Sequence, residues 1–271
     1  MENQILDENV SQSTEVSFDD RVKNILDNGY NFDLGKYLST GAQILNKNAG
    51  GFIGFLFVWG IIQIGVGLIP LLGSIANWLI ISPCMMAGMY LMAHRVFKGR
   101  NTDFGKFFSG FQYSGPLALL TFIMTLMFAA IVIPYIFIVL GSMVFTIIDT
   151  LREFQSGNED PMLILQFILD LMMKFIFLFI IIWLVGIFFS FAQYIVVFGK
   201  KNFWDAMVLS VKIVSKKYFY FLMFSILLAL INVAGALVIL IGLLYTVPLS
   251  ICAMYAAYEH IVGTNLSDVA E

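Results

Sequence analysis

One layout occurs three times along this chain: a helix cap, a short amphipathic stretch, one or two basic residues, then two long apolar runs. Runs of about 20 apolar residues can cross a hydrocarbon core of about 30 Å as a helix. In lipid each backbone polar group must be satisfied within its own segment, so helices are the expected spanning elements. The layout therefore predicts an all-α, polytopic transmembrane helical bundle.

The composition agrees with a membrane protein. Of 271 residues, 60% are hydrophobic and 12% are charged, whereas soluble domains carry about 25% charged residues. The net charge of -3 divides into an acidic N-terminal tail and basic loops, which argues against a nucleic-acid partner. The tail has no basic stretch followed by an apolar run, so we expect no cleavable signal peptide.

Six segments are long and apolar enough to be spans. The first pair is joined at about Pro70 to Ser74 and the last pair at Asn232 to Gly235, which predicts two tight helical hairpins. The few polar residues within the spans are expected to form hydrogen bonds between helices. The expected spans are residues 50–69, 71–97, 115–135, 173–198, 218–233 and 236–262, and the polar residues are Gln63, Asn77, Gln193 and Asn232.

The distribution of basic residues predicts the orientation. Lysine and arginine concentrate on the cytoplasmic side of membrane proteins. Here they concentrate before the first span, between the second and third, and between the fourth and fifth, whereas the other connections are mainly acidic. Both termini are therefore expected in the cytoplasm, which requires an even number of spans and agrees with six.

Internal similarity predicts three repeated units. Pro83 precedes Met89 and Tyr90 by the same spacing as Pro248 precedes Met254 and Tyr255. We expect a transmembrane domain over residues 32–265, with an acidic, partly disordered tail before it and a short tail after it. The units are residues 33–100, 103–200 and 202–263, and the tails are residues 1–31 and 266–271.

Each unit is expected to begin with a short amphipathic helix on the cytoplasmic membrane surface. Asp33, Asp103 and Asn202 are suitable N-cap residues, and each precedes an apolar face of helical spacing. The three helices would form a collar whose basic residues contact anionic lipid headgroups. A further capped helix is expected after Ser17. The headgroup contacts are Lys98, Arg100, Lys106, Lys200, Lys201, Lys216 and Lys217.

The segment between the third and fourth spans is too long for two plain crossings. Apolar residues continue past Pro134 to Ile148, break over residues 149–161, and resume after Met162. Either the helices project beyond the bilayer as an apolar hairpin, or this segment lies along the outer surface. We favour a helical extension over residues 135–172 that docks onto a surface, either membrane or protein.

Three stretches resemble uncharacterised bacterial six-span membrane proteins related to the membrane-anchor domain of glycerophosphoryl diester phosphodiesterases. The resemblance extends from Asn31 to Gly263 and implies residence in the bacterial cytoplasmic (inner) membrane. Such anchors are joined to a separate catalytic domain, and we recognise no soluble domain here, so the resemblance implies no phosphodiesterase activity. The stretches are Thr102 to Phe111, Trp204 to Ser210, and Thr246 to Leu249 with Met254 to Tyr258.

Two groups of polar residues are candidate sites, because polar groups are costly in a membrane. Asp170 and Lys174 are four residues apart on one helix face, so they can pair with each other. His94, Glu259 and His260 lie at the cytoplasmic ends of repeat-related spans and could meet. For this trio, a structural role at the helix ends is favoured over metal binding.

The chain lacks the known signatures of catalysis, including nucleophile elbows, phosphate loops and paired-histidine motifs. We therefore expect no enzyme, no metal and no cofactor. The leading hypothesis is a binding or assembly module for a membrane protein partner or lipid. The alternative is a small carrier of apolar or amphipathic molecules. An intramembrane enzyme would need a convergent pair such as Glu259 with His94.

Overall fold

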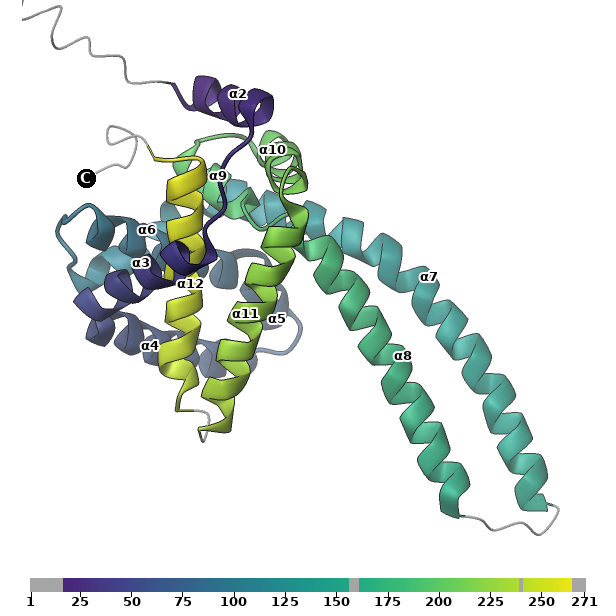
Figure 1. Cartoon of the computed structure of the whole chain (residues 1–271). Helices are drawn as coiled ribbons and strands as arrows, with labels where there is room; N and C mark the ends of the chain where they lie inside the picture. The colour runs from purple at the N-terminus through teal and green to yellow at the C-terminus, as the bar shows by residue number, and fades with distance from the viewer. Residues whose placement is uncertain (1–16, 156–160, 239–240, 265–271) are drawn as a thin grey trace, which may run out of the picture. The chain divides into compact units, whose positions relative to one another are not determined.

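A computed structural model describes residues 17–155, 161–238 and 241–264, and all regular secondary structure in these ranges is helical. The all-α prediction is therefore confirmed (Figure 1). The chain divides into two compact units: unit 1 is residues 1–120 with 188–271, and unit 2 is residues 121–187. The expected tails before residue 17 and after residue 264 lie outside the described residues.

The helices follow one another with short connections. Unit 1 holds most of them, while α8 and the greater part of α7 form unit 2. The helices are α2 (Phe18–Asn28), α3 (Leu34–Lys47), α4 (Ala49–Gly67), α5 (Leu72–Ala76), the π-helix η1 (Asn77–Ile81), α6 (Ser82–Phe97), the 3-10 helix η2 (Phe104–Tyr113), α7 (Ser114–Gln155), α8 (Pro161–Ile187), α9 (Ala192–Phe198), α10 (Phe203–Ser215), α11 (Tyr218–Leu237) and α12 (Leu243–Ile261).

Five helical stretches among the described residues are long and apolar enough to cross a membrane, which supports the prediction of a membrane protein. They are Ala49–Gly67, Leu72–Phe97, Phe104–Asp149, Leu165–Phe198 and Tyr218–Leu237. The sixth expected span corresponds to α12, which is helical but is not among these five. Because α12 packs against α3, α4, α6 and α11, it needs less apolar surface and can carry polar residues near its end.

The hairpin turn expected at Asn232 to Gly235 was misplaced, because α11 continues to Leu237. Asn232 Nδ2 donates to the Leu228 carbonyl one turn earlier (2.9 Å) and to Ser250 Oγ on α12 (2.8 Å). Its amide thus links two helices instead of shaping a turn. Such interhelical hydrogen bonds contribute about 0.6–2 kcal/mol in membrane proteins.

The first hairpin is also joined by polar side chains, as the sequence predicted. Gln63 on α4 and Asn77 on η1 exchange two hydrogen bonds of 2.9 and 2.7 Å, and Ser82 Oγ donates to Asn77 Oδ1 at 3.1 Å. A third predicted partner, Gln193, accepts from the hydroxyl of Tyr90 at 3.1 Å. These side chains fix the relative register of neighbouring helices within unit 1.

Each short amphipathic helix packs on a different helix of unit 1. In unit 1, η2 contacts α6, α10 contacts α9, and α3 contacts α12; Figure 1 shows α3 lying across α12. The first two helices pack on the element that precedes them in the chain, and α3 packs on the last helix of the chain. The three short helices therefore pack in a cyclic order, in which the first of them contacts the last helix of the chain.

Small residues allow these crossings. A Cβ on Gly41 of α3 would lie 2.5 Å from the backbone nitrogen of Ala253 on α12, and a Cβ on Gly88 of α6 would overlap the carbonyl oxygen of Phe107 in η2. Ser210 of α10 instead uses its hydroxyl, which donates to the Phe188 carbonyl at 2.8 Å. Close backbone approach at small residues is typical of helix packing in membranes.

The predicted helix caps are confirmed at three of four positions. The side chains of Ser17, Asp33 and Asn202 accept backbone N–H groups at the starts of α2, α3 and α10. The prediction for Asp103 was wrong, since its side chain caps no backbone group of η2 and instead accepts from Asn101 Nδ2 at 2.7 Å. A 3-10 helix winds more tightly, so the N-cap geometry of an α-helix is not formed there.

In unit 2, α7 and α8 lie side by side as an antiparallel pair (Figure 1). α7 is one continuous helix of 42 residues that passes through Pro134. The hydroxyl of Tyr135 on α7 donates to the backbone carbonyl of Lys174 on α8 at 2.8 Å. The segment after Pro134 therefore continues as a helix to Gln155, as the favoured prediction required. Residues 156–160 lie outside the described ranges.

Candidate functional site

A polar cluster in unit 1 brings together two of the three predicted residues, His94 on α6 and Glu259 on α12. The hydroxyl of Tyr255 lies between them, 2.9 Å from His94 Nδ1 and 3.3 Å from Glu259 Oε2. Thr264 Oγ1 donates to Glu259 Oε2 at 2.7 Å, and Lys98 Nζ forms an ion pair with Glu259 Oε1 at 2.6 Å. His94 is fully buried, so the cluster anchors the end of α6 to the end of α12.

The Nδ1 atom of His94 lies 2.9 Å from the Tyr255 hydroxyl and 3.3 Å from the Thr264 hydroxyl. Tyr255 and Thr264 each have one hydroxyl proton, and both donate it to Glu259. With both hydroxyl protons directed at Glu259, the oxygen of Tyr255 accepts from His94 Nδ1 in the tautomer that carries its proton there. Its Nε2 is left as a buried base with no hydrogen-bond partner among the described residues.

His260 does not join this cluster. Its Nδ1 lies 3.0 Å from the hydroxyl of Tyr37 on α3, because successive residues of a helix point about 100° apart. Burial raises the pKa of Tyr37. The phenol therefore stays neutral, and His260 with Tyr37 forms a separate contact between α12 and α3.

Most of the lysines expected to meet lipid headgroups have partners within the protein. Lys98 pairs with Glu259, Lys201 pairs with Asp19 of α2 at 2.7 Å, and Lys216 donates to the Leu26 carbonyl of α2 at 2.6 Å. Lys217 lies over the Tyr220 ring, and Lys200 and Arg100 also have interaction partners. Lys106 on η2 is half-buried. The acidic helix α2 thus covers part of the basic surface of α10.

The predicted pair in unit 2 is present. Lys174 Nζ lies 2.6 Å from Asp170 Oδ2, and it also donates to Ser142 Oγ on α7 at 2.9 Å. The Asp170 side chain is half exposed. The ion pair and the serine together hold α8 against α7, which supports a structural role over a proton or ion relay.

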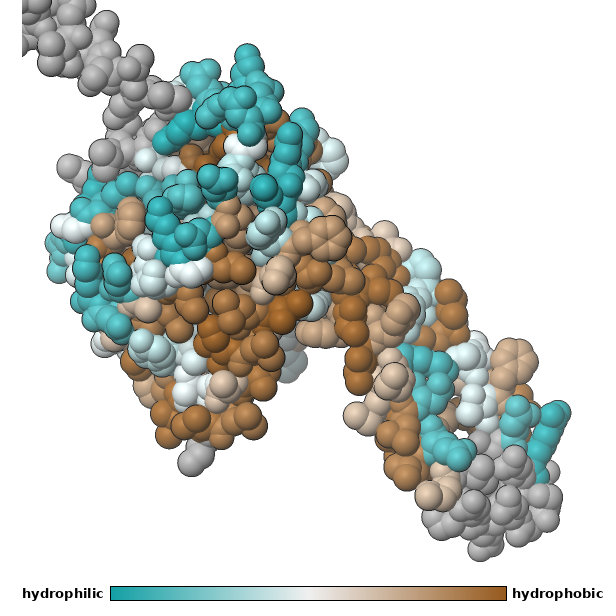
Figure 2. Space-filling model, in the orientation of Figure 1, coloured by the Kyte–Doolittle hydropathy of each residue, from teal (hydrophilic) through white to brown (hydrophobic). Residues whose placement is uncertain are grey.

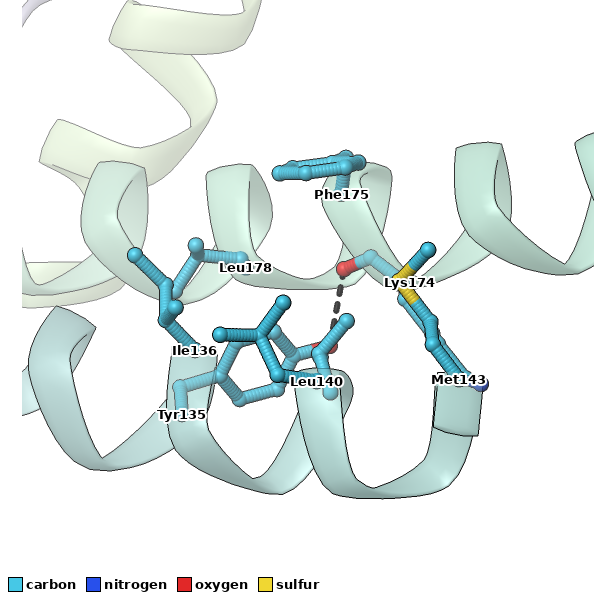
Figure 3. Close-up of a pocket in the computed structure, with 8 residues that line it drawn as sticks. Tyr135, Ile136, Leu140, Met143, Lys174, Phe175 and Leu178 are labelled. Atoms are coloured by element: carbon cyan, nitrogen blue, oxygen red, sulfur yellow. Dashed lines mark hydrogen bonds between the residues drawn. The ribbon is translucent and has the colours of Figure 1, made fainter. Parts of the chain in front are cut away.

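A pocket of about 110 Å³ lies between α7 and α8 beside this pair (Figure 3). Apolar side chains surround it, and the hydrogen bond from Tyr135 to Lys174 passes along one side. Small-molecule sites usually measure about 300–1,000 Å³, so this pocket fits one apolar side chain. Its lining residues are Tyr135, Ile136, Val139, Leu140, Met143, Lys174, Phe175 and Leu178.

Large apolar side chains are exposed along unit 2, where Figure 2 shows a mostly hydrophobic surface on both helices. Phe137 is 70% exposed and Phe145 is 72% exposed. Exposed apolar patches of this kind mark sites of contact with lipid or another protein. Further exposed residues are Ile138, Leu140, Val144, Ile147, Ile148, Met162, Leu165, Ile168, Leu169, Met172 and Met173.

Sequence reasoning missed Tyr255, Thr264 and Ser142 as members of these polar groups. Thr264 follows Gly263, whose φ of 76° turns the chain back toward Glu259. No local pattern indicates such a contact. For Tyr255 a signal existed, because it lies four residues before Glu259 and so shares its helix face.

The described residues hold no group of three or more His, Cys, Asp or Glu side chains that could bind a metal ion. Cys84 and Cys252 are buried as free thiols. No protein-family model, curated protein or solved structure matches the chain. The function is therefore inferred from the contacts of the side chains.

Proposed function

We propose that this chain is a non-enzymatic integral membrane protein that serves as an assembly module, and that the outer parts of α7 and α8 bind a membrane protein partner. One observation carries the proposal: α7 is a continuous helix of 42 residues. It is therefore about 63 Å long. This is about twice the thickness of the hydrocarbon core.

Tilting does not remove the excess length. Membrane helices tilt by up to about 40°, which leaves α7 extended by about 48 Å along the membrane normal. About 18 Å of helix then lies beyond a core of about 30 Å. At this tilt the outer part begins at about residue 140 and carries Phe145, which is 72% exposed. Apolar surface that water would otherwise meet there needs a protein cover.

The continuity of α7 favours a protein partner over the membrane surface. A helix that crosses the bilayer and then lies along its outer face needs a sharp bend, usually at a proline. The helix instead continues through Pro134 to Gln155. Methionines on α8, among them Met172 and Met173, add an adaptable apolar surface.

The remaining features of the proposal concern the membrane domain. We propose three repeated units with six membrane helices and both termini in the cytoplasm of a bacterial inner membrane. The cyclic packing of α3, η2 and α10 supports the repeat, and the basic connections support the orientation. The relation to phosphodiesterase membrane anchors remains a proposal that rests on residue patterns alone.

Site-specific photocrosslinking tests the partner. A benzoyl-phenylalanine at Phe145 is expected to crosslink one defined membrane protein in the native membrane. The matched control is the same replacement at Phe219 on α11, which is 76% exposed and expected to face lipid. A partner band at position 145 and none at position 219 is the expected result. Lipid adducts alone at both positions would contradict the proposal.

The alternative function, a carrier of apolar or amphipathic molecules, receives less support. It needs a cavity large enough for a substrate, of about 300 Å³ or more. The pocket between α7 and α8 has about 110 Å³. Substrate-dependent flux into proteoliposomes would nevertheless establish the carrier function.

A further inference from the structure

Two lysines that flank α10 hold the short helix α2 at both of its ends. Lys201 precedes α10 and Lys216 follows it; they are called the flanking lysines below. In the first turn of α2, the Asp19 carboxylate accepts Lys201 Nζ at 2.7 Å on Oδ1 and at 3.0 Å on Oδ2. Carbonyls in the last turn of a helix lack helical partners, and Lys216 Nζ donates to the Leu26 carbonyl at 2.6 Å.

Apart from these contacts, α2 has a small apolar interface. Of its 11 residues only Val22 and Ile25 are buried. Isolated helices shorter than about 12–15 residues are marginal in water, so α2 depends on its contacts with unit 1 to stay helical. The Asp19 side chain is 72% exposed, and exposed ion pairs contribute little to stability. The contact is therefore weak enough to open while the rest of unit 1 stays folded.

The flanking lysines lie where a membrane presents its headgroups. The candidate spans Leu165–Phe198 and Tyr218–Leu237 lie on either side of α10 in the chain, so residues 199–217 stay at one face of the membrane. Trp204 on α10 is 58% exposed, and exposed tryptophan is typical of the interface between hydrocarbon and water. Both ammonium groups are therefore within reach of headgroups.

An anionic headgroup offers the flanking lysines the same kind of partner that α2 offers them. In the structure each ammonium contacts acceptor oxygens, those of the Asp19 carboxylate and of the Leu26 carbonyl. A phospholipid phosphate also presents acceptor oxygens, and it carries a negative charge that a carbonyl lacks. An anionic surface attracts each nearby lysine by about fivefold in the equilibrium constant, or about 25-fold for the two together.

We infer that Lys201 and Lys216 form a binding site for anionic lipid headgroups, that α2 is its removable cover, and that lipid binding releases α2. The inference rests on the part of the proposed function that places unit 1 in a membrane. Zwitterionic lipid leaves α2 docked, because it offers no net negative charge to compete with Asp19. The flanking lysines contact either α2 or headgroups, but not both at once.

The accessibility of a cysteine on the buried side of α2 measures the release. Val22→Cys replaces a side chain that is 4% exposed with one of similar size. Asn24→Cys lies on the exposed side of α2 and gives the reference rate at the same membrane. Native Cys84 and Cys252 are fully buried, so the unsubstituted protein gives the labelling background. Purified protein would be held in phosphatidylcholine nanodiscs, with or without phosphatidylglycerol, and labelled with a water-soluble maleimide at constant ionic strength.

Phosphatidylglycerol is expected to raise the labelling rate of Val22→Cys, relative to that of Asn24→Cys, by about tenfold or more. With Lys201→Gln and Lys216→Gln together, this ratio should be the same in both lipids. Lys47→Gln is the matched control, because Lys47 is exposed at the end of α3 and closely precedes the span formed by α4. Its ratio should rise as in the protein without this substitution.

An unchanged ratio in phosphatidylglycerol would overturn the inference. So would an equal rise in phosphatidylcholine nanodiscs with soluble inorganic phosphate, because α2 would then be exchanging with a free anion and not with lipid. A lipid response that persists in the double glutamine variant would contradict the assignment to the flanking lysines. The test requires no partner protein, so this inference and the partner proposal for α7 and α8 can fail separately.

Discussion

Gly88→Ala is expected to lower the free energy of unfolding by about 3 kcal/mol, the upper part of the range for overpacked interiors. The added methyl on α6 would overlap the backbone carbonyl of Phe107 in η2. Backbone cannot rotate away as a long side chain can, so η2 and α6 must separate. Unfolding in mixed detergent and SDS micelles, followed by near-ultraviolet circular dichroism, measures the change.

Gly60→Ala on α4 is the control for this prediction. Nothing lies within 4 Å of a Cβ at Gly60, and alanine is the better helix former by about 1 kcal/mol. Equal or greater stability is expected. If the two variants Gly88→Ala and Gly60→Ala have the same free energy of unfolding, the close crossing of η2 and α6 does not contribute to stability as described.

Glu259→Gln is expected to lower the free energy of unfolding by about 2 kcal/mol, because it leaves a partly buried lysine without its counter-charge. The Lys98 and Glu259 side chains are 22% and 12% exposed, and they approach to 2.6 Å. The substitution also weakens the acceptor of Tyr255 and Thr264. Thermal unfolding in detergent should show a lower midpoint for the variant than for the wild-type protein.

A double-mutant cycle separates the ion pair from general damage. With Lys98→Met in place, Glu259→Gln should cost clearly less than in the wild-type protein, because the charge it would strand is absent. Asp27→Asn is the control, since Asp27 is exposed on α2 and a neutral result is expected. Fully additive effects of the two substitutions would show that Lys98 and Glu259 act independently.

Local sequence patterns predicted the parts of the fold that local physics determines. Asp33 and Asn202 cap α3 and α10 because a short side-chain oxygen reaches the first-turn N–H groups wherever the chain goes next. Gln63 and Asn77 were predicted to form hydrogen bonds between helices because an unpaired amide in an apolar span is costly. These predictions needed no knowledge of tertiary packing.

Contacts between distant residues were only partly predictable. The proximity of His94 and Glu259, which meet through Tyr255, followed from the similarity of the two span ends. His260 lies against Tyr37 instead, because successive residues of a helix point about 100° apart. Thr264 reaches the cluster through the left-handed turn at Gly263. The packing of α3 on α12 depends on chain closure across more than 200 residues, which no local pattern encodes.

Native mass spectrometry of the protein extracted from its own membrane in a mild detergent tests the assembly function most directly. The wild-type chain is expected to carry one protein adduct in fixed stoichiometry. A variant with Phe145→Glu, in the part of α7 beyond the core, is expected to lose that adduct and keep its own fold. A wild-type chain that carries no protein, or a variant that retains the same adduct, would contradict the proposal that the outer parts of α7 and α8 bind a membrane protein partner.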